Sequence, residues 1–417
     1  MESLYTDTVA FGILMVVLGL IFYTAHSRHA FWQRFYRYVP PLLLCYFIPG
    51  LLHEPLGIIS TEDSQLYYVA SRYLLPASLV LLCLSIDFKG IYSLGYRAIV
   101  MFLAATFGII IGGPVALYVV VSFFPGLINA ELEQIWRGLS TVAGSWIGGG
   151  ANQTAMKEIF EVGDDIFASM VVVDVIVANI WMGFLLYGAS VSDKLDRWLK
   201  ADNSAITDLK NKISDYRAQV ERIPSTTDMF VLGGVGFGAV ALGHWGSDMI
   251  VGYLENSRET LEAYNLNSLL SGFFWLIVIT TTIGLVLSFT KYRQLEGVGA
   301  SKWGSVFIYI LVATIGMKMD LTQVFENLGL FAVGIIWMLI HVIILLITAK
   351  LIKAPFFFVA VGSQANIGGA ASAPIVASAF SPSLAAVGVL MAVLGYALGT
   401  YGAIVCALLM KWSASLF

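Results

Sequence analysis

The chain has 417 residues, of which 58% are hydrophobic and 12% are charged, and its formal net charge is −4. Soluble domains carry about 25% charged residues, so this composition argues against a water-soluble enzyme and predicts an all-α polytopic membrane protein. The negative net charge leaves no basic surface for nucleic acid. The three cysteines lie in apolar runs, which argues against a disulfide framework.

Twelve apolar stretches are candidate spanning helices, each of which needs about 20 mostly apolar residues. They lie near residues 8–25, 38–53, 69–87, 97–124, 134–160, 165–190, 229–247, 267–289, 303–319, 328–352, 355–380 and 383–410. The first is predicted to be a retained helix, because Glu2 and Asp7 precede it and no basic residue does. Glycines and polar amides interrupt 134–160 and 355–380, whereas the other stretches are continuous.

A charged linker at 193–228 separates two transmembrane halves, residues 1–192 and 229–417. The linker holds seven basic and seven acidic residues. Apolar residues recur in it at helical spacing, and they are Ile206, Leu209, Ile213, Tyr216 and Val220. This spacing predicts an amphipathic helix that ends before Pro224. The helix would lie on the protein or the bilayer surface, or it would form a short dimer contact.

The two halves share three features in the same order, which predicts an internal repeat. The segment Asp87–Gly95 resembles Asp320–Gly329, and a long apolar helix follows each. The segments Gly144–Gln153 and Gly362–Ala371 then both contain Gly-Ser and Ile-Gly-Gly, with an asparagine nearby. One last apolar helix follows each segment. Chance similarity between glycine-rich helices is the alternative.

Basic residues mark one set of loops, and the positive-inside rule assigns these loops to the cytoplasm. They are Arg28, Arg34, Arg37, Lys89, Arg97, Lys291, Arg293, Lys302, Lys350, Lys353 and Lys411. The loops 53–66 and 124–134 are acidic and are assigned to the outside. This pattern predicts an outer N-terminus, a cytoplasmic C-terminus, inverted halves and about eleven spans. Twelve full spans would not satisfy these conditions, so 229–247 is predicted to be shallow, re-entrant or interfacial.

The two interrupted helices predict a ligand site near mid-membrane. Backbone groups freed by a break are costly against lipid, so such breaks persist where they line a cavity or a site. Freed carbonyls would coordinate Na⁺, and half-helix N-termini favour anions. The candidate solute-binding residues are Ser145, Trp146, Gly149, Gly150, Asn152, Gln153, Thr154, Gln364, Asn366, Gly368 and Ser372. The alternative is that the glycines only allow close helix packing.

Asp174 lies near the middle of an apolar run, where a charge is costly and usually functional. It would ligate a coupling cation, carry a proton, or pair structurally with neighbouring groups. The candidate sodium or proton site comprises Asn152, Asp174, Ser363, Gln364 and Asn366. No further cofactor is predicted.

Other polar residues have ordinary structural interpretations. Asp87 and Asp320 would cap helices or lie at the membrane interface. Arg72 and Arg137 would snorkel to the surface or attract an anionic solute, and His341 would be a packed core histidine. The sequence lacks the motifs G-x-x-x-x-G-K-[ST], H-E-x-x-H, C-x-x-C and G-x-S-x-G, which argues against ATP-driven transport and against an enzyme.

Four runs carry a resemblance to known proteins, and they are FGILMVVLGLIFYTAHSRHAFW, YYVASRYLLPASLVLLCLSIDFKGI, GSWIGGGANQTAM and ANIGGAASAPIVASAF. Through them the chain resembles the YjcL-like family of bacterial membrane proteins, whose function is unknown. The paired breaks are also similar to the sodium symporters of the bile-acid, glutamate and 2-hydroxycarboxylate groups. That resemblance implies inverted repeats whose broken helices cross at Gly148–Gln153 and Gln364–Gly369. It also implies a core that moves against a scaffold, a homodimer and a place in the bacterial inner membrane.

The predicted function is secondary active transport of a small polar or anionic organic solute. Coupling would be to Na⁺ or, as the second choice, to H⁺, with alternating access of the elevator type. The rival interpretations are an exporter, a channel, a non-transporting membrane sensor and, without a convincing nucleophile and base, an intramembrane enzyme. The identity of the solute and the direction of transport stay open.

Overall fold

The computed structural model describes residues 6–39, 41–53, 56–59, 64–128, 130–202, 223–263, 267–318, 329–381 and 384–417. The first half forms α1 (Asp7–Ala25), α2 (Ala30–Tyr38), α3 (Pro41–His53), α4 (Leu66–Val69), the π-turn η1 (Ala70–Leu74), α5 (Leu75–Leu84), α6 (Phe88–Ser93), α7 (Tyr96–Phe123), α8 (Leu132–Gly148), α9 (Gly150–Ile159), α10 (Asp164–Ser190) and α11 (Ser192–Leu199). The second half forms α13 (Thr226–Leu254), α14 (Arg258–Ala263), α15 (Gly272–Ser288), the 3-10 helix η6 (Lys291–Val298), α16 (Ala300–Gly316), α17 (Gly329–Ile352), α18 (Phe356–Ile367), α19 (Gly369–Phe380) and α20 (Ala385–Ala414). The predicted linker helix at 206–220 and the repeat segment that contains Asp320 lie outside these described residues.

Seven of the described helices are long and apolar enough to cross a membrane. They are Asp7–Ala25, Leu66–Leu84, Tyr96–Phe123, Asp164–Ser190, Thr226–Leu261, Gly329–Ile352 and Val387–Ala414. An eighth candidate arises if α15 and η6, bent by 96°, count as one span. Helix α16 and the second part of α3 are shorter apolar helices. The predicted helical membrane architecture is therefore confirmed, and the predicted count of about eleven spans is not.

The stretch 229–247, predicted to be shallow, re-entrant or interfacial, is not re-entrant in the structure. It lies within α13, a continuous helix of 29 residues. The helix starts at a capping box, because Ser225 Oγ accepts a hydrogen bond from Asp228 N and Asp228 Oδ2 accepts one from Ser225 N. A Cβ on Gly233 or Gly238 would meet open space. These glycines neither break the helix nor allow a close approach of another helix.

The interrupted stretch 134–160 is a hairpin, here called hairpin 1, and not the predicted crossing helix. Helices α8 and α9 are joined by Gly149, whose φ of +77° reverses the chain. The arms lie side by side: Arg137 Nη1 donates to Phe160 O at 3.0 Å, and the Trp136 and Phe160 ring centroids are 5.5 Å apart. A continuous helix would separate residues this far apart in sequence by about 35 Å.

The stretch 355–380 forms a second hairpin, hairpin 2, from α18 and α19. The turn includes Gly369, whose φ is +55°. The Phe357 and Phe380 ring centroids are 5.3 Å apart, and Gln364 Nε2 donates to Ser372 Oγ at 2.6 Å. The prediction that two broken helices cross is therefore wrong, because each of them doubles back at a glycine.

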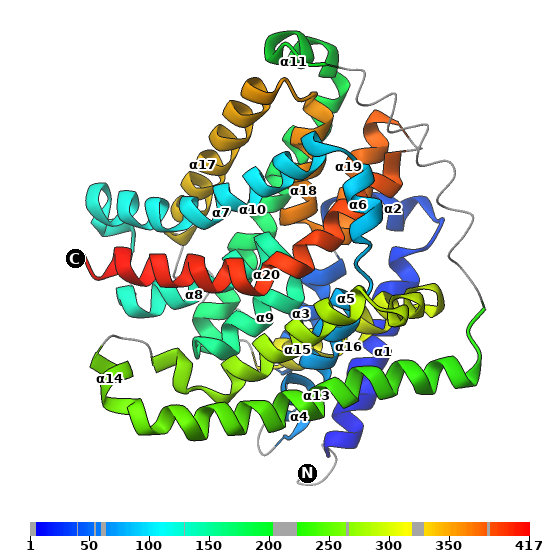
Figure 1. Cartoon of the computed structure of the whole chain (residues 1–417), viewed down its shortest axis with the longest axis vertical. Coiled ribbons are helices and arrows are strands. Elements are labelled where there is room, and N and C mark those ends of the chain that lie inside the picture. The colour runs from blue at the N-terminus through cyan, green and yellow to red at the C-terminus, as the bar shows by residue number, and fades with distance from the viewer. Residues whose placement is uncertain are drawn as a thin grey trace.

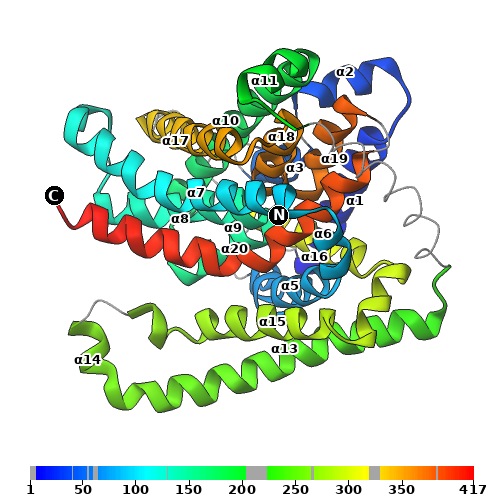
Figure 2. The same cartoon turned by 45° about the horizontal axis from the view of Figure 1, so that its top comes forward.

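The long helices fall into two groups. The hairpin group contains α7 to α10 and α17 to α20, and the outer group contains α1, α3, α5, α13, α15 and α16. Figure 2 shows α13 and α15 side by side along one edge with α5 next to them, while α7, α8, α17 and α20 lie together away from that edge. Figure 1 shows the same α13 extending along the margin of the molecule. The two groups meet mainly where α5 and α15 contact α9 and α20.

One end of the bundle, here called the termini end, gathers the start of α1 and the end of α20. Gln65 N donates to Asp7 Oδ2 at 2.9 Å, and Lys157 Nζ donates to Tyr67 OH at 3.3 Å. The same end includes Trp136, since its ring contacts that of Phe160 and lies 5.7 Å from Lys411 Nζ. Hairpin 1 therefore enters the bundle from the termini end.

The opposite end, the linker end, gathers the end of α10 and the start of α18. Arg97 Nη2 pairs with Asp202 at 3.0 Å, and Arg97 Nε donates to Ile352 O at 3.4 Å. Asp196 Oδ1 accepts from Phe356 N at 2.7 Å, which ties α11 to hairpin 2. Hairpin 2 therefore enters from the linker end, opposite to hairpin 1.

The predicted sides of two segments disagree with this arrangement. The charge pattern predicts a cytoplasmic C-terminus and places the loop 124–134 outside. The Phe417 and Tyr118 ring centroids are 5.4 Å apart, and Ser413 Oγ donates to Pro114 O at 3.0 Å. Both contacts place the end of α20 beside the end of α7, next to the loop 124–134. The two segments share one end, so that pair of assignments is wrong.

Candidate functional site

The tips of the two hairpins meet at one turn of α20. A Cβ on Gly395 would lie 2.7 Å from Ile147 O in hairpin 1 and 3.5 Å from Ala365 O in hairpin 2. Farther along α20, a Cβ on Gly399 would lie 2.6 Å from Gly148 Cα. Only glycine allows such close approach of two backbones. The two breaks predicted from sequence are thus brought together in the protein interior.

Hairpin 1 is anchored by the carboxylate of Asp174 on α10, which is only 4% exposed. Three donors of the hairpin surround it: Ser145 Oγ at 2.6 Å, Trp146 Nε1 at 2.7 Å and Gln153 Nε2 at 3.0 Å. Tyr46 OH on α3 donates to Gln153 Oε1 at 3.4 Å. These bonds satisfy a buried charge, as burial demands. Asp174 therefore holds the two arms of hairpin 1 together from outside the hairpin.

Asn152 fastens the tip of hairpin 1 to α20. Its Nδ2 donates to Gly148 O at 3.0 Å, and its Oδ1 accepts from Thr400 Oγ1 at 2.6 Å. The side chain is fully buried. Both ends of the amide are engaged, so Asn152 has a fixed orientation.

Asn366 has the corresponding role in hairpin 2. Its Nδ2 donates to Gly362 O at 3.0 Å and to Phe102 O at 3.2 Å, and its Oδ1 accepts from Thr106 Oγ1 at 2.7 Å. In both hairpins an asparagine bonds the carbonyl four residues earlier and a threonine on a long helix. Hairpin 2 is thereby fixed to α7 as hairpin 1 is fixed to α20.

Ser363 joins hairpin 2 to a buried histidine. His341 Nδ1 lies 3.1 Å from Ala105 O, a carbonyl that only accepts, so this nitrogen carries the proton. Ser363 Oγ then donates to His341 Nε2 at 2.8 Å and accepts from Trp181 Nε1 at 2.8 Å. His341 is a fully buried core histidine, as predicted, and it also orients Ser363.

Gln364 differs from the other amides, because its Oε1 is buried and has no hydrogen-bond partner among the described residues. The residue is 2% exposed, and its Nε2 is held by Ser372 Oγ. The oxygen lies close to the end of α18, where the last carbonyls of a helix lack helical donors. This oxygen therefore has the capacity to accept a hydrogen bond from water or to ligate a cation.

The five residues of the candidate cation site do not form one cluster of free ligands. Asp174, Asn152, Asn366 and Ser363 all have donors on their oxygens, and only the Gln364 oxygen is open within the described residues. In the same described ranges, no group of three or more His, Cys, Asp or Glu side chains is arranged to hold a metal.

The remaining predicted solute residues divide into two sets. Gly149, Gly150 and Gly368 lie at the tips and are half-buried. Thr154 Oγ1 bonds carbonyls of its own helix, and Ser372 faces Gln364. The N-caps of α9 and α19 are Gly149 and Gly368, and neither provides a side-chain cap. Two helix N-termini with their partial positive charges therefore lie at the meeting point.

A cluster of ion pairs joins hairpin 1 to the outer group at the termini end. Arg72 in η1 pairs with Glu158 at the end of α9 at 2.7 Å, and their side chains are 30% and 11% exposed. Lys157 pairs with Asp164 at 2.9 Å and lies 3.9 Å from Glu158. The Arg72 guanidinium also lies 4.3 Å from the ring centroid of Phe273 on α15. These contacts tie the two groups together at this end of their interface.

The other predicted surface residues have identifiable partners. Arg137 pairs with Glu133 at 2.8 Å, four residues earlier on the same helix. Asp87 is the N-cap residue of α6 and pairs with Arg293. These contacts support structural roles for both, as the sequence indicated.

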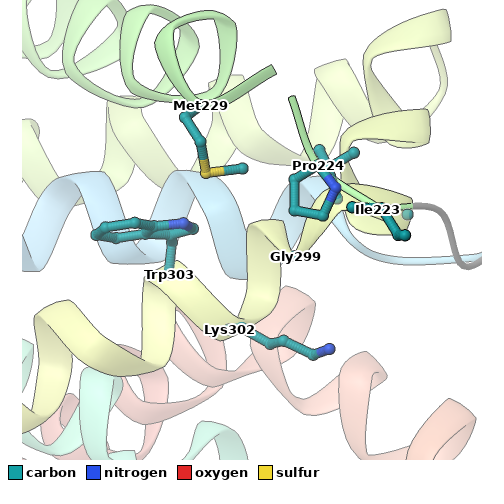
Figure 3. Close-up of a pocket in the computed structure, with 8 residues that line it drawn as sticks. Ile223, Pro224, Met229, Gly299, Lys302 and Trp303 are labelled. Carbon is teal, nitrogen blue, oxygen red and sulfur yellow. The ribbon is translucent and has the colours of Figure 1, made fainter. Parts of the chain in front are cut away.

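Two cavities open at the linker end. The first, of about 270 Å³, lies between the outer group and α20 and includes Asp87, Glu296 and Tyr396 in its lining. The second, of about 500 Å³, lies between the start of α13 and α16, and Figure 3 shows Met229 facing Trp303 across it. Lys302 contributes to the lining of both cavities.

Several residues of the site were missed by sequence reasoning. They are Tyr46, Thr106, Trp181, Gly395 and Thr400. A usable signal existed for α20, since its glycines at 395, 399 and 402 recur on one helix face. The partners of the asparagines gave no such signal, because Thr400 lies 248 residues from Asn152 in the sequence.

Comparison with known proteins identifies relatives without a described activity. A family model described as "Protein of unknown function (DUF819)" matches residues 12–412. The chain is also similar to "Uncharacterized membrane protein YjcL" of Bacillus subtilis (strain 168). The two are 24% identical over 366 residues, which cover 84% of this chain and 85% of that protein. The predicted resemblance to the YjcL-like family is confirmed.

Proposed function

We propose that this chain, which belongs to the DUF819 family of membrane proteins of unknown function, is a secondary active transporter. It would move a small polar or anionic organic solute together with Na⁺. The proposal rests on one observation above all: two helical hairpins from the two halves place their tips against Gly395 inside the protein. Discontinuous helices at such a place are the pattern of transporter binding sites.

The arrangement of the helices supports inverted repeats. We propose that five helical segments of each half cross between the two ends: α1, α3, α4 to α5, α7 and α10 in the first, and α13, α15, α16, α17 and α20 in the second. Five crossings in each half invert the second half relative to the first, and the two hairpins enter from opposite ends. We propose these ten crossings in place of eleven. The N- and C-termini then share one side.

The charge distribution supports the orientation of this arrangement. Basic residues of the described chain concentrate at the linker end, and they include Arg97, Lys200, Arg293, Lys302 and Lys353. The positive-inside rule then assigns the linker end to the cytoplasm and both termini to the outside.

The two ends differ in a way that supports alternating access. The ion pair of Arg72 and Glu158 would close the termini end, whereas the linker end has the cavity beside α20. We propose that the hairpin group moves as an elevator against the outer group, within a homodimer. The structure described here then corresponds to the state that is open to the cytoplasm.

The coupling ion has a specific place in this proposal. Gln364 Oε1 would ligate Na⁺ together with carbonyls at the end of α18, where the helix dipole favours a cation. The two uncapped N-termini at the tips would attract the anionic group of the solute.

The thermal stability of the purified protein in Na⁺, K⁺ or choline tests this sodium site without a known solute. Sodium in about 100-fold excess over its Kd would stabilise the fold by about 2.7 kcal/mol. We expect Gln364→Met to lose this sodium-specific gain and to lower the stability in K⁺ by only about 1 kcal/mol, since its Oε1 has no donor to lose and its Nε2 gives up one hydrogen bond to Ser372 Oγ. The exposed Gln134→Met on α8 is the matched control. An unchanged sodium shift in Gln364→Met contradicts the site, and no shift in the natural protein favours proton coupling.

Breaking the Arg72–Glu158 pair is expected to open the termini end. In a chain without native cysteines, Ser71→Cys places a thiol at a position that is 1% exposed, beside Arg72. We expect Glu158→Gln to raise its labelling by a membrane-impermeant thiol reagent about tenfold, which corresponds to about 1.4 kcal/mol. The exchanged pair Arg72→Glu with Glu158→Arg should restore slow labelling. Equal labelling in all three chains would contradict the proposed closure.

A further inference from the structure

The cavity at the linker end has one polar wall and one apolar wall. The polar wall comes from the outer group, and it consists of Ser85, Asp87, Glu296, Ser301, Lys302 and Ser305. The facing wall comes from α20 and is apolar apart from Tyr396. The volume of about 270 Å³ is just below the range of about 300–1,000 Å³ of cavities that hold drug-sized ligands. A small metabolite therefore fits this space.

The cavity lies close to the tips of both hairpins. Ser305 precedes Ile308 by about one turn of α16, and Ile308 Cγ2 is 3.8 Å from where a Cβ on Gly150 would lie. On the opposite wall, Tyr396 directly follows Gly395, the residue that contacts both tips. The cavity is thus bordered by the two helices that reach the tips.

Charges of both signs surround the cavity. The carboxylate of Asp87 is held by Arg293, and that of Glu296 accepts from Ser301 N at 2.9 Å and from Ser301 Oγ at 2.6 Å. Lys302 adds an ammonium group to the same wall. Lys302 is the one cation among the described residues of this lining, and with Arg293 paired to Asp87 the two carboxylates are balanced by two cations. A dicarboxylate would find no surplus positive charge here, whereas a solute with one charge of each sign finds complementary groups.

We infer that the transported solute is a small zwitterion with an ammonium and a carboxylate group, of the size of an amino acid. The inference rests on the proposed transport function and specifies its substrate class. The ammonium group binds near Glu296 and Asp87, while the carboxylate lies towards Lys302. The serine hydroxyls of the polar wall already donate to protein oxygens, so they accept from the ammonium group.

Binding to the purified full-length protein in Na⁺ tests the substrate class directly. The probes are L-alanine and L-serine as zwitterions, succinate as a dianion and ethanolamine as a cation, each followed by thermal stability and calorimetry. We expect a saturable stabilisation by a zwitterion and none by succinate or ethanolamine. Stabilisation by succinate or ethanolamine instead of a zwitterion, or by none of the probes, overturns the inference.

Two variants locate the site, with a control at the opposite end. Glu296→Gln keeps an acceptor for Ser301 but removes the charge, and we expect it to weaken zwitterion binding about tenfold or more. Lys302→Gln should weaken the same binding, while the exposed Glu255→Gln should not change it. Unchanged affinity in both Glu296→Gln and Lys302→Gln overturns the site. The sodium-specific gain in thermal stability that depends on Gln364 is measured in a separate experiment. The result for the zwitterion site therefore does not decide the transport proposal.

Discussion

Replacing Asp174 by alanine is expected to lower the free energy of unfolding by about 3 kcal/mol or more. The change leaves the hydroxyl of Ser145, the indole N–H of Trp146 and the amide of Gln153 without an acceptor in a buried place. Each unsatisfied buried donor costs about 1–3 kcal/mol. Thermal or denaturant unfolding of the purified protein in K⁺ measures the loss. The stability of Asp174→Asn should lie between that of the natural protein and that of Asp174→Ala, because its one amide oxygen can still accept hydrogen bonds.

The control for this prediction lies on the same helix. Asp165 is in the first turn of α10 and is exposed, so Asp165→Ala should change stability by less than about 1 kcal/mol. The outcome separates two roles of Asp174. If it were primarily a coupling-ion ligand, Asp174→Ala would remove the sodium shift and keep the stability in K⁺. That result would contradict the anchoring role described here.

Replacing Gly395 by alanine is expected to abolish the sodium-dependent stabilisation while the protein still folds. The new Cβ would lie 2.7 Å from Ile147 O, a backbone atom that cannot turn aside as a side chain could. Overpacking of this kind costs about 1–3 kcal/mol, against a gain in helix propensity of about 1 kcal/mol. The strain therefore acts on the hairpin tips more than on the whole fold. Thermal stability in Na⁺ and K⁺ measures both effects.

Gly183→Ala is the matched substitution for this experiment. Gly183 lies within α10, and a Cβ there meets no atom within 4 Å. We expect the same gain in helix propensity without the strain, so the sodium shift should equal that of the natural protein. A normal sodium shift in Gly395→Ala would contradict the view that the meeting of the tips forms the cation site.

The positions of the two breaks were predictable, because the signal is local. Glycines and amides clustered within an apolar run are costly unless the backbone turns inside the protein. The direction of the chain after each break was not predictable, since it depends on the positive φ of Gly149 and Gly369. A chain that crosses and a chain that doubles back have the same composition. The predicted crossing helices were therefore wrong, although their locations were right.

The different roles of the three buried amides could not be predicted from the sequence, because they depend on long-range contacts. Asn152, Asn366 and Gln364 look alike in the sequence, yet two have partners on α20 and α7 and one retains an open oxygen. The prediction that the C-terminus lies on the opposite side from the loop 124–134 was wrong for a related reason. Lys411 counted as a cytoplasmic charge, but it lies over the ring of Trp136 beside the acidic loop. A single basic residue is a weak indicator when its partner is unknown.

The bond between Asn152 and Thr400 has a consequence for synthesis of the chain. The two residues are 248 positions apart, and a ribosome that adds about 5–20 residues per second needs roughly 12–50 s to make that length. During this time hairpin 1 has been made, but the helix that receives its tip has not. The nascent chain must therefore keep a polar hairpin away from lipid until its last helix emerges. A chain that lost α20 through a late stop codon would have a complete hairpin 1 without the helix that binds its tip. We expect such a chain to be recognised as misfolded in the membrane.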